Sequence, residues 1–105
     1  MSWVTTCSVP AKEVTVSQYK VVHYINQFFG QIGGEEMADY PAEKRPGPIG
    51  PGLAFTQALG EDAAITATIV CGDSWFNENL ELARQTVLDM VREEAPDLFI
   101  AGPAF

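Results

Sequence analysis

Three short segments rich in β-branched and aromatic residues constrain the fold of this chain more than any other feature. They are residues 21–25 (Val-Val-His-Tyr-Ile), 65–71 (Ile-Thr-Ala-Thr-Ile-Val-Cys) and 98–101 (Leu-Phe-Ile-Ala). Residues of these types favour strands, and runs this apolar are typical of strands buried on both faces of a parallel sheet. In the middle segment, strict alternation predicts that the odd-numbered residues from Ile65 to Cys71 share one face.

Two helices are expected between these strands. The first spans residues 53–59 and ends at Gly60, a residue that suits left-handed backbone at a helix C-terminus. The second carries apolar residues at three- and four-residue steps, namely Leu80, Ala83, Val87, Met90 and Val91. Ser74 and Asn77 are the alternatives for its N-cap, and Pro96 should end it. The apolar face of this second helix should cover the sheet.

The order strand, helix, strand, helix, strand predicts an α/β domain. We expect a three-layer unit with a mostly parallel sheet, equivalent to half of a flavodoxin-like or Rossmann-like fold. This domain should span residues 19–105, and residues 1–18, which show no sustained periodicity, should form an N-terminal extension. A short edge strand through Val14 and Val16 is the alternative for the extension. Unpaired edges of a sheet with three strands also favour self-association.

Composition and charge exclude several classes of function. Six basic and fourteen acidic residues give the 105-residue chain a net charge of −8, which disfavours nucleic acid as a partner. The chain has no signal-peptide pattern and no apolar run near the roughly 18 to 20 residues that span a bilayer, so we expect a cytoplasmic protein without membrane contact. Cys7 and Cys71 show neither metal-ligand spacing nor a disulfide framework, so no metal site is expected.

Position in the predicted sheet indicates where a site should lie. Ligands of parallel α/β sheets bind beyond the carboxyl ends of the strands. Glycines and prolines between Asn26 and Pro51 predict one long loop there, and long loops in compact domains usually have a function. The candidate substrate-site residues in these loops and strand ends are His23, Asn26, Gly33, Gly34, Glu35, Glu36, Cys71 and Asp73.

Each candidate also has a purely structural interpretation. Gly33 and Gly34, with Gly30, would let backbone amides approach an anion, but their spacing is not that of the dinucleotide-binding fingerprint. Because Glu35 and Glu36 are adjacent, we expect one solvated carboxylate and one that anchors the loop.

The remaining candidates are weighed in the same way. Cys71 is expected to pack in the core, because no nearby basic residue would lower its pKa. Asp73 could orient a substrate or cap a helix, and both interpretations stay open. His23 is favoured as a hydrogen-bonded core residue over a catalytic base. No complete catalytic set can be assembled from this sequence.

Several strings in fixed order resemble a known family. They are Val21-Val-His-Tyr-Ile-Asn-Gln-Phe-Phe29, Gly33-Gly-Glu-Glu36 with Ala38-Asp39, Gly50-Pro-Gly-Leu53, Ile69-Val-Cys-Gly-Asp73, Glu78-Asn79 and Pro96-Asp-Leu-Phe-Ile-Ala-Gly-Pro-Ala-Phe105. From about Lys20 onward the chain resembles the N-terminal part of the selenoprotein B subunit of glycine, sarcosine and betaine reductases of anaerobic bacteria.

The resemblance implies an oxidoreductase that reductively cleaves a carbon–nitrogen bond of a small amino acid or betaine. It implies a companion subunit whose carbonyl holds the substrate amine, a selenocysteine that attacks the methylene carbon, and selenoprotein A as acceptor of the carboxymethyl group. The family's selenocysteine motif lies beyond the matching region, so neither Cys7 nor Cys71 inherits that role. We therefore expect a fragment or a piece of a split protein that holds no cofactor itself and is inactive alone.

Two functions of other classes are the alternatives. One is a non-catalytic α/β binding or assembly module that has kept the fold and lost the chemistry. The other is a small anion-binding flavodoxin-like protein, whose melting temperature phosphate or flavin would raise. The sequence does not distinguish among glycine, sarcosine and betaine as the substrate.

Overall fold

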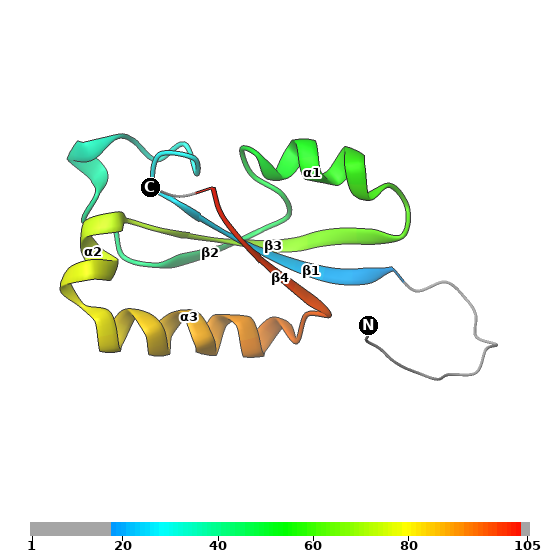
Figure 1. Ribbon diagram of the computed structural model, residues 1–105. Coiled ribbons are helices and arrows are strands. Elements are labelled where there is room, and N and C mark those ends of the chain that lie inside the picture. Colours follow the sequence, from blue (N-terminus) through cyan, green and yellow to red (C-terminus); the bar gives the residue numbers. More distant parts are fainter. Residues whose placement is uncertain (1–17, 104–105) are drawn as a thin grey trace.

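A computed structural model describes residues 18–103 of the chain (Figure 1). The elements in chain order are β1 (Tyr19–Asn26), η3 (Glu35–Met37), β2 (Glu43–Pro46), α1 (Gly52–Leu59), β3 (Ala63–Cys71), α2 (Asp73–Glu78), α3 (Leu80–Glu94) and β4 (Leu98–Ala101). The strands form one four-stranded sheet in the order β2-β3-β1-β4. Helix α1 lies on one side of this sheet, and α2 and α3 lie on the other (Figure 1). The predicted three-layer α/β architecture is therefore confirmed.

The sheet is mostly parallel, as predicted. β1 pairs in parallel with β3 along its whole length and with β4 from Val21 to Tyr24. β1 therefore lies between β3 and β4 in the sheet. Polypeptide leaving β1 moves toward β3, whereas polypeptide leaving α3 returns to the opposite side of β1. The direction of winding changes between β1 and β4, which in doubly wound sheets is where a ligand crevice forms.

A β-bulge divides the core into two clusters. The register shifts after Val21, which pairs with Ile65, so that Val22 pairs with Ala67. Val21 and Ile65 therefore pack on the side of Phe55 in α1. Ala67 packs instead with Val22, on the side of α3. The prediction that the odd-numbered residues of β3 share one face is wrong for Ile65, because the extra residue of a bulge reverses the alternation.

Helix α3 covers the second cluster with much of the predicted apolar face. Ala83 is fully buried, and Val87, Met90 and Val91 pack against the core residues of β1 and β3. Leu80 was predicted on the same face but is 57% exposed, because it begins α3 at the junction with α2, before the helix reaches the sheet.

The start of the predicted helix was also wrong. Two helices occupy the segment: α2 has Gly72 as its N-cap, and α3 has Asn79. Neither Ser74 nor Asn77 is a cap. The side-chain amide of Asn79 donates instead to the Trp75 carbonyl, at the end of α2. The expected end is confirmed, since Ala95 adopts left-handed backbone directly before Pro96.

The segment predicted as one long loop contains two further elements. These are the 3-10 turn η3 and β2, which pairs antiparallel with β3 from Glu43 to Pro46. A strand made of charged residues and proline has no apolar alternation, so the sequence did not reveal it. Proline is tolerated there because β2 is an edge strand, whose outer backbone groups need no partner in the sheet.

The third predicted strand, β4, has the expected bounds but is not buried. Leu98 is 51% exposed and Phe99 is 40% exposed, while Ile100 packs against the Val21 cluster. β4 pairs with β1 on one side, and in the part of the chain that the structure describes no strand pairs with its other side.

The predicted N-terminal extension falls almost wholly outside the described residues, as do its alternative edge strand and Cys7. The boundary at residue 18 stays a prediction. Among the helices of residues 18–103, none has the length and apolar character required to cross a membrane.

Candidate functional site

The loops that follow β1 and β3 are joined by hydrogen bonds at the carboxyl end of the sheet. The Asn26 side-chain amide donates to the Asp73 carboxylate at 3.1 Å. The Asp73 backbone amide donates to the side-chain carbonyl of Gln27 at 3.0 Å, and the Gln27 side-chain amide donates to the Gly34 carbonyl at 3.3 Å. Asn26 and Gln27 are buried, so the polar groups of these two side chains hold Asp73 in a defined place.

A pocket of about 250 Å³ opens at this junction, between the loops after β1 and β3 and not at the change of winding between β1 and β4. Its lining consists of Gln27, Phe28, Gly34, Glu35 and Asp73. Two carboxylates, one aromatic ring and one amide suit a small ligand that carries positive charge or hydrogen-bond donors. We refer to it below as the strand-end pocket.

The turn after β1 has a tightly specified backbone. The Asn26 side-chain carbonyl accepts the Phe29 amide at 2.9 Å, and the Asn26 backbone carbonyl accepts the Gly30 amide at 2.9 Å. A Cβ atom on Gly30 would lie 2.6 Å from a methyl carbon of Val70, so the turn packs directly on β3. Asn26 thereby shapes the turn with its carbonyl oxygens and holds Asp73 with its amide.

The two adjacent glutamates have different environments. Glu36 accepts the backbone amide of Gly34 at 3.2 Å, and a Cβ atom on Gly33 would lie 2.9 Å from the same carboxylate. Glu36 is thus the carboxylate that anchors the glycine turn. Glu35 is exposed and lines the strand-end pocket.

Cys71 lies at the end of β3 and is fully buried. Burial raises the pKa of its thiol, and a hydrogen bond with Tyr24 only partly opposes that effect. Burial also raises the pKa of the Tyr24 hydroxyl, to which Cys71 and Asp73 contribute further. A thiol with a raised pKa is protonated at neutral pH and is a poor nucleophile, which fits the interpretation of Cys71 as a core residue.

His23 lies in the middle of β1 and is also fully buried. Its Nε2 atom is hydrogen-bonded to the carbonyl of Gly102, the first residue after β4, and its ring meets the edge of Phe55 with centroids 5.2 Å apart. Within residues 18–103, Nδ1 has no hydrogen-bond partner. His23 is not among the residues that line the strand-end pocket; it connects β1 to the segment after β4.

The structure therefore brings together half of the predicted site residues and separates the rest. Asn26, Gly34, Glu35 and Asp73 contact one another or line one pocket. Gly33 and Glu36 belong to the turn that carries Gly34 but do not line the pocket, and His23 and Cys71 lie in the core.

Sequence reasoning missed Gln27, which bridges the loops after β1 and β3. Its position was the available signal, because a polar residue directly after a buried strand lies at the edge where ligands bind. Among the described residues, no group of three or more His, Cys, Asp or Glu side chains could hold a metal ion.

The fold and the pocket place this chain in the class of doubly wound α/β domains with a polar site at the carboxyl ends of parallel strands. The family described as "Glycine/sarcosine/betaine reductase selenoprotein B (GRDB)" matches residues 18–105. The chain belongs to this family, as the sequence motifs indicated.

Curated relatives carry the names of all three reductases. The chain is 62% identical over 86 residues to "Glycine reductase complex component B subunit gamma" of Symbiobacterium thermophilum, covering 82% of this chain and 20% of the relative. It is 51% identical over 90 residues to "Sarcosine reductase complex component B subunit beta" of Peptoclostridium acidaminophilum, covering 86% and 21%. It is 40% identical over 86 residues to "Betaine reductase complex component B subunit beta" of the same organism, covering 82% and 20%.

The chain thus spans about a fifth of the length of these relatives. The matching region is their N-terminal part. No solved structure matches the chain.

Proposed function

We propose that this chain forms the N-terminal α/β part of component B of a reductase that acts on glycine, sarcosine or betaine. The observation that carries the proposal is the match of residues 18–105 to the family, with relatives named for each of the three reductases. The reaction would be the reductive cleavage of the bond between the substrate's nitrogen and its methylene carbon, and the protein would act in the cytoplasm.

In this proposal the chain positions the substrate and does not attack it. The sequence contains two cysteines, Cys7 and Cys71, and the thiol of Cys71 is buried and protonated at neutral pH. The selenocysteine nucleophile and the carbonyl that holds the substrate amine would come from other parts of component B. Selenoprotein A would accept the carboxymethyl group.

The strand-end pocket is the proposed substrate-side contribution of this chain. Glycine, sarcosine and betaine each carry a positively charged nitrogen at neutral pH, and the pocket presents the carboxylates of Asp73 and Glu35. Opposite charges within a few ångströms attract each other more strongly where water is partly excluded. Because Asn26 and Gln27 hold Asp73, its carboxylate needs little reorganisation to bind a cation.

Amine release by the assembled reductase tests this proposal. The N-terminally tagged chain is purified without oxygen from the organism that encodes it, and release of ammonia, methylamine or trimethylamine is measured with each substrate. We expect Asp73→Asn and Glu35→Gln to raise KM about tenfold, equivalent to ~1.4 kcal/mol of binding. Asp89→Asn and Glu81→Gln are the matched controls, since both side chains lie on the exposed surface of α3, away from the pocket lining.

Two results would contradict the proposal. If the chain purifies without other component B subunits and the preparation releases no amine, the non-catalytic binding module is the better description. If Asp73→Asn and Asp89→Asn have equal KM values and the complex is intact, the strand-end pocket does not bind the substrate. The proposal that the chain is part of component B would still stand.

A further inference from the structure

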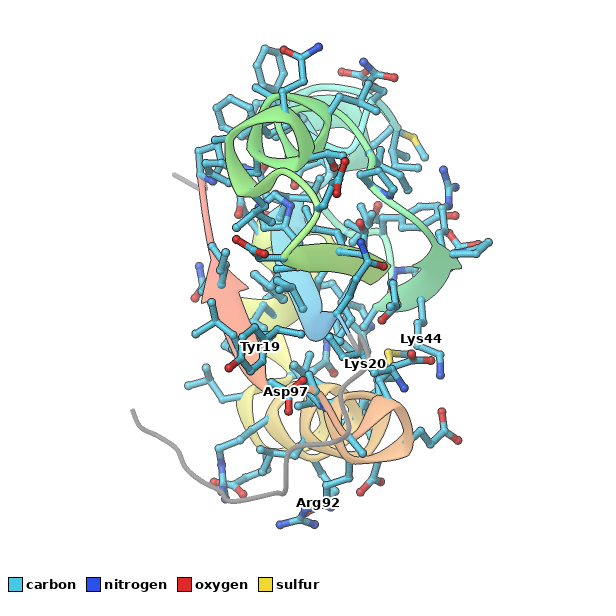
Figure 2. All side chains as sticks on the ribbon, turned by 90° about the vertical axis from the view of Figure 1, so that its right-hand side faces the viewer. Tyr19, Lys20, Lys44, Arg92 and Asp97 are labelled. Atoms are coloured by element: carbon cyan, nitrogen blue, oxygen red, sulfur yellow. The ribbon has the colours of Figure 1, made fainter. Side chains whose placement is uncertain are left out.

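Strand β4 has the apolar sequence of an interior strand and the exposure of an edge strand. Its residues Leu-Phe-Ile-Ala include no charge and no proline, yet Leu98 and Phe99 are 51% and 40% exposed. In Figure 2, which views the molecule from the right-hand side of Figure 1, β4 lies at one border of the sheet and β2 at the other.

The two borders are built differently. β2 carries Glu43, Lys44, Arg45 and Pro46, and charged residues and proline are the usual means by which edge strands resist further pairing. Lys44 also reaches two carboxylates of α3, at 2.8 Å from Glu93 and 3.0 Å from Glu94. β4 has none of these protective features, so it is the border at which the sheet can continue.

Hydrogen bonding shows which groups of β4 are available. The Asp97 amide donates to the Lys20 carbonyl at 2.7 Å, and the Gly102 amide donates to the Tyr24 carbonyl at 2.8 Å, so both ends of β4 are fixed to β1. Alternation along a strand directs every second amide to the opposite side. Tyr24 is in register with Ala101 and accepts the Gly102 amide, so within β4 the amides of Leu98 and Ile100 face β1 like that of Gly102. The amides of Phe99 and Ala101 therefore face the open border.

The side chains of β4 are distributed over both faces. Leu98 is in register with Val21 and Phe99 with Val22, and these two valines belong to the clusters on the α1 side and the α3 side. A strand added beside β4 would therefore extend both core clusters at once. Parallel sheets normally have both faces covered in this way.

We propose that β4 pairs in parallel with a strand from the part of component B that this chain does not cover. This inference rests on the proposed function. The chain corresponds to about a fifth of its relatives' length, so most of such a subunit is available to supply the strand. The parallel strands lie in the order β3-β1-β4. In a doubly wound fold with this order, the next parallel strand is added beside β4.

Co-purification with the missing part tests this pairing. The 105-residue chain is co-expressed with the Symbiobacterium thermophilum subunit from which the matched 86-residue region has been removed, with cysteine encoded at any selenocysteine codon. The test variant is Leu98→Lys, which places a charge on the open border. The matched control is Leu53→Lys on α1, because Leu53 is 58% exposed and Leu98 is 51% exposed.

We expect the wild-type chain and Leu53→Lys to bind the remaining polypeptide equally, and Leu98→Lys to bind at least tenfold more weakly. The melting temperatures of the three isolated chains should agree, which shows that the variants fold. A second variant, Ala101→Pro, removes one outward amide without adding charge and should weaken binding as well.

The outcomes separate this inference from the proposed function. If the wild-type chain does not bind the remaining polypeptide at all, the role in component B fails. If it binds and Leu98→Lys binds equally well, that role stands and the pairing through β4 is overturned. If the chain forms a dimer that Leu98→Lys dissociates and that the remaining polypeptide does not displace, β4 pairs with a second copy of this chain. The proposed partner strand is then wrong.

Discussion

The two border strands of the sheet differ in whether their residues protect them from pairing with a further strand. At the β2 border, a short charged strand ends in Pro46 and its Lys44 is paired with α3. At the β4 border, an uncharged apolar strand leaves Leu98 and Phe99 exposed. The same sheet therefore ends at one side and stays open at the other.

The comparison shows that exposure of an apolar strand is informative when the opposite edge is protected. Edge strands that stay unpaired usually carry charged residues or proline, as β2 does. Because β2 carries the protective residues, the absence of such residues from β4 points to a neighbour at that border.

The largest expected effect contrasts the interior of the sheet with its open border. Ile69 is fully buried in β3, whereas Leu98 is 51% exposed. Ile69→Ala should lower the free energy of unfolding by about 2–5 kcal/mol, because it leaves a cavity in the core. Leu98→Ala should lower it by less than about 1 kcal/mol. Urea denaturation of the isolated chain measures both, and equal losses would mean that β4 is already buried.

An intermediate effect concerns the attachment of β2. The buried Thr68 hydroxyl donates to the Gly47 carbonyl at 2.7 Å, directly after β2. Thr68→Val keeps the shape and removes this bond, so it should cost about 1 kcal/mol. The control is Thr56→Val, whose hydroxyl donates to Gly52 within α1, and it should cost less. A larger loss for the control would show that this bond does not hold the β2 border.

The smallest effect is a pH dependence of the β2 border. A hydrogen bond from Lys44 lowers the pKa of Glu94 below its ordinary value of 4.5. Hydrogen bonds from Tyr40 and then Arg45 lower that of Glu43. Because both values fall on folding, their stabilisation is complete above pH 4.5 and is lost as the pH falls through the folded-state values.

Thermal unfolding between pH 6 and pH 3 measures this contribution. The double variant Glu43→Gln and Glu94→Gln should show a shallower fall in melting temperature than the wild type. High salt should also reduce the difference, because the pairs lie at the surface. Identical pH profiles would assign the acid sensitivity to other carboxylates.

The parts of the fold that depend on hydrophobic pattern could be predicted from the sequence. β4, α1 and the sheet-facing side of α3 lie within a residue or two of their expected positions, because burial imposes a period on each of them. β2 could not be predicted, since its pairing depends on the position of β3 and not on its own composition. The bulge at Thr66 was missed for a related reason, because one residue inserted into a strand leaves the composition unchanged.

The candidate site was predicted in position but not in detail. The rule that ligands bind at the carboxyl ends of parallel strands located Asn26 and Asp73. Gln27 and Phe28 emerge only from the packing of the turn after β1 against β3. The sequence could not show that Glu35 faces the pocket and Glu36 anchors the turn, because that choice depends on the backbone of η3.

Hydrogen exchange at the outward amides of β4 tests the central claim most directly. Exchange of the Phe99 and Ala101 amides is compared between the isolated chain and the chain bound to the remaining four-fifths of a component B subunit. The account predicts fast exchange in isolation and at least tenfold slower exchange in the complex, with β2 unchanged. Equal exchange of the β4 amides in both states, with the complex formed, would contradict it.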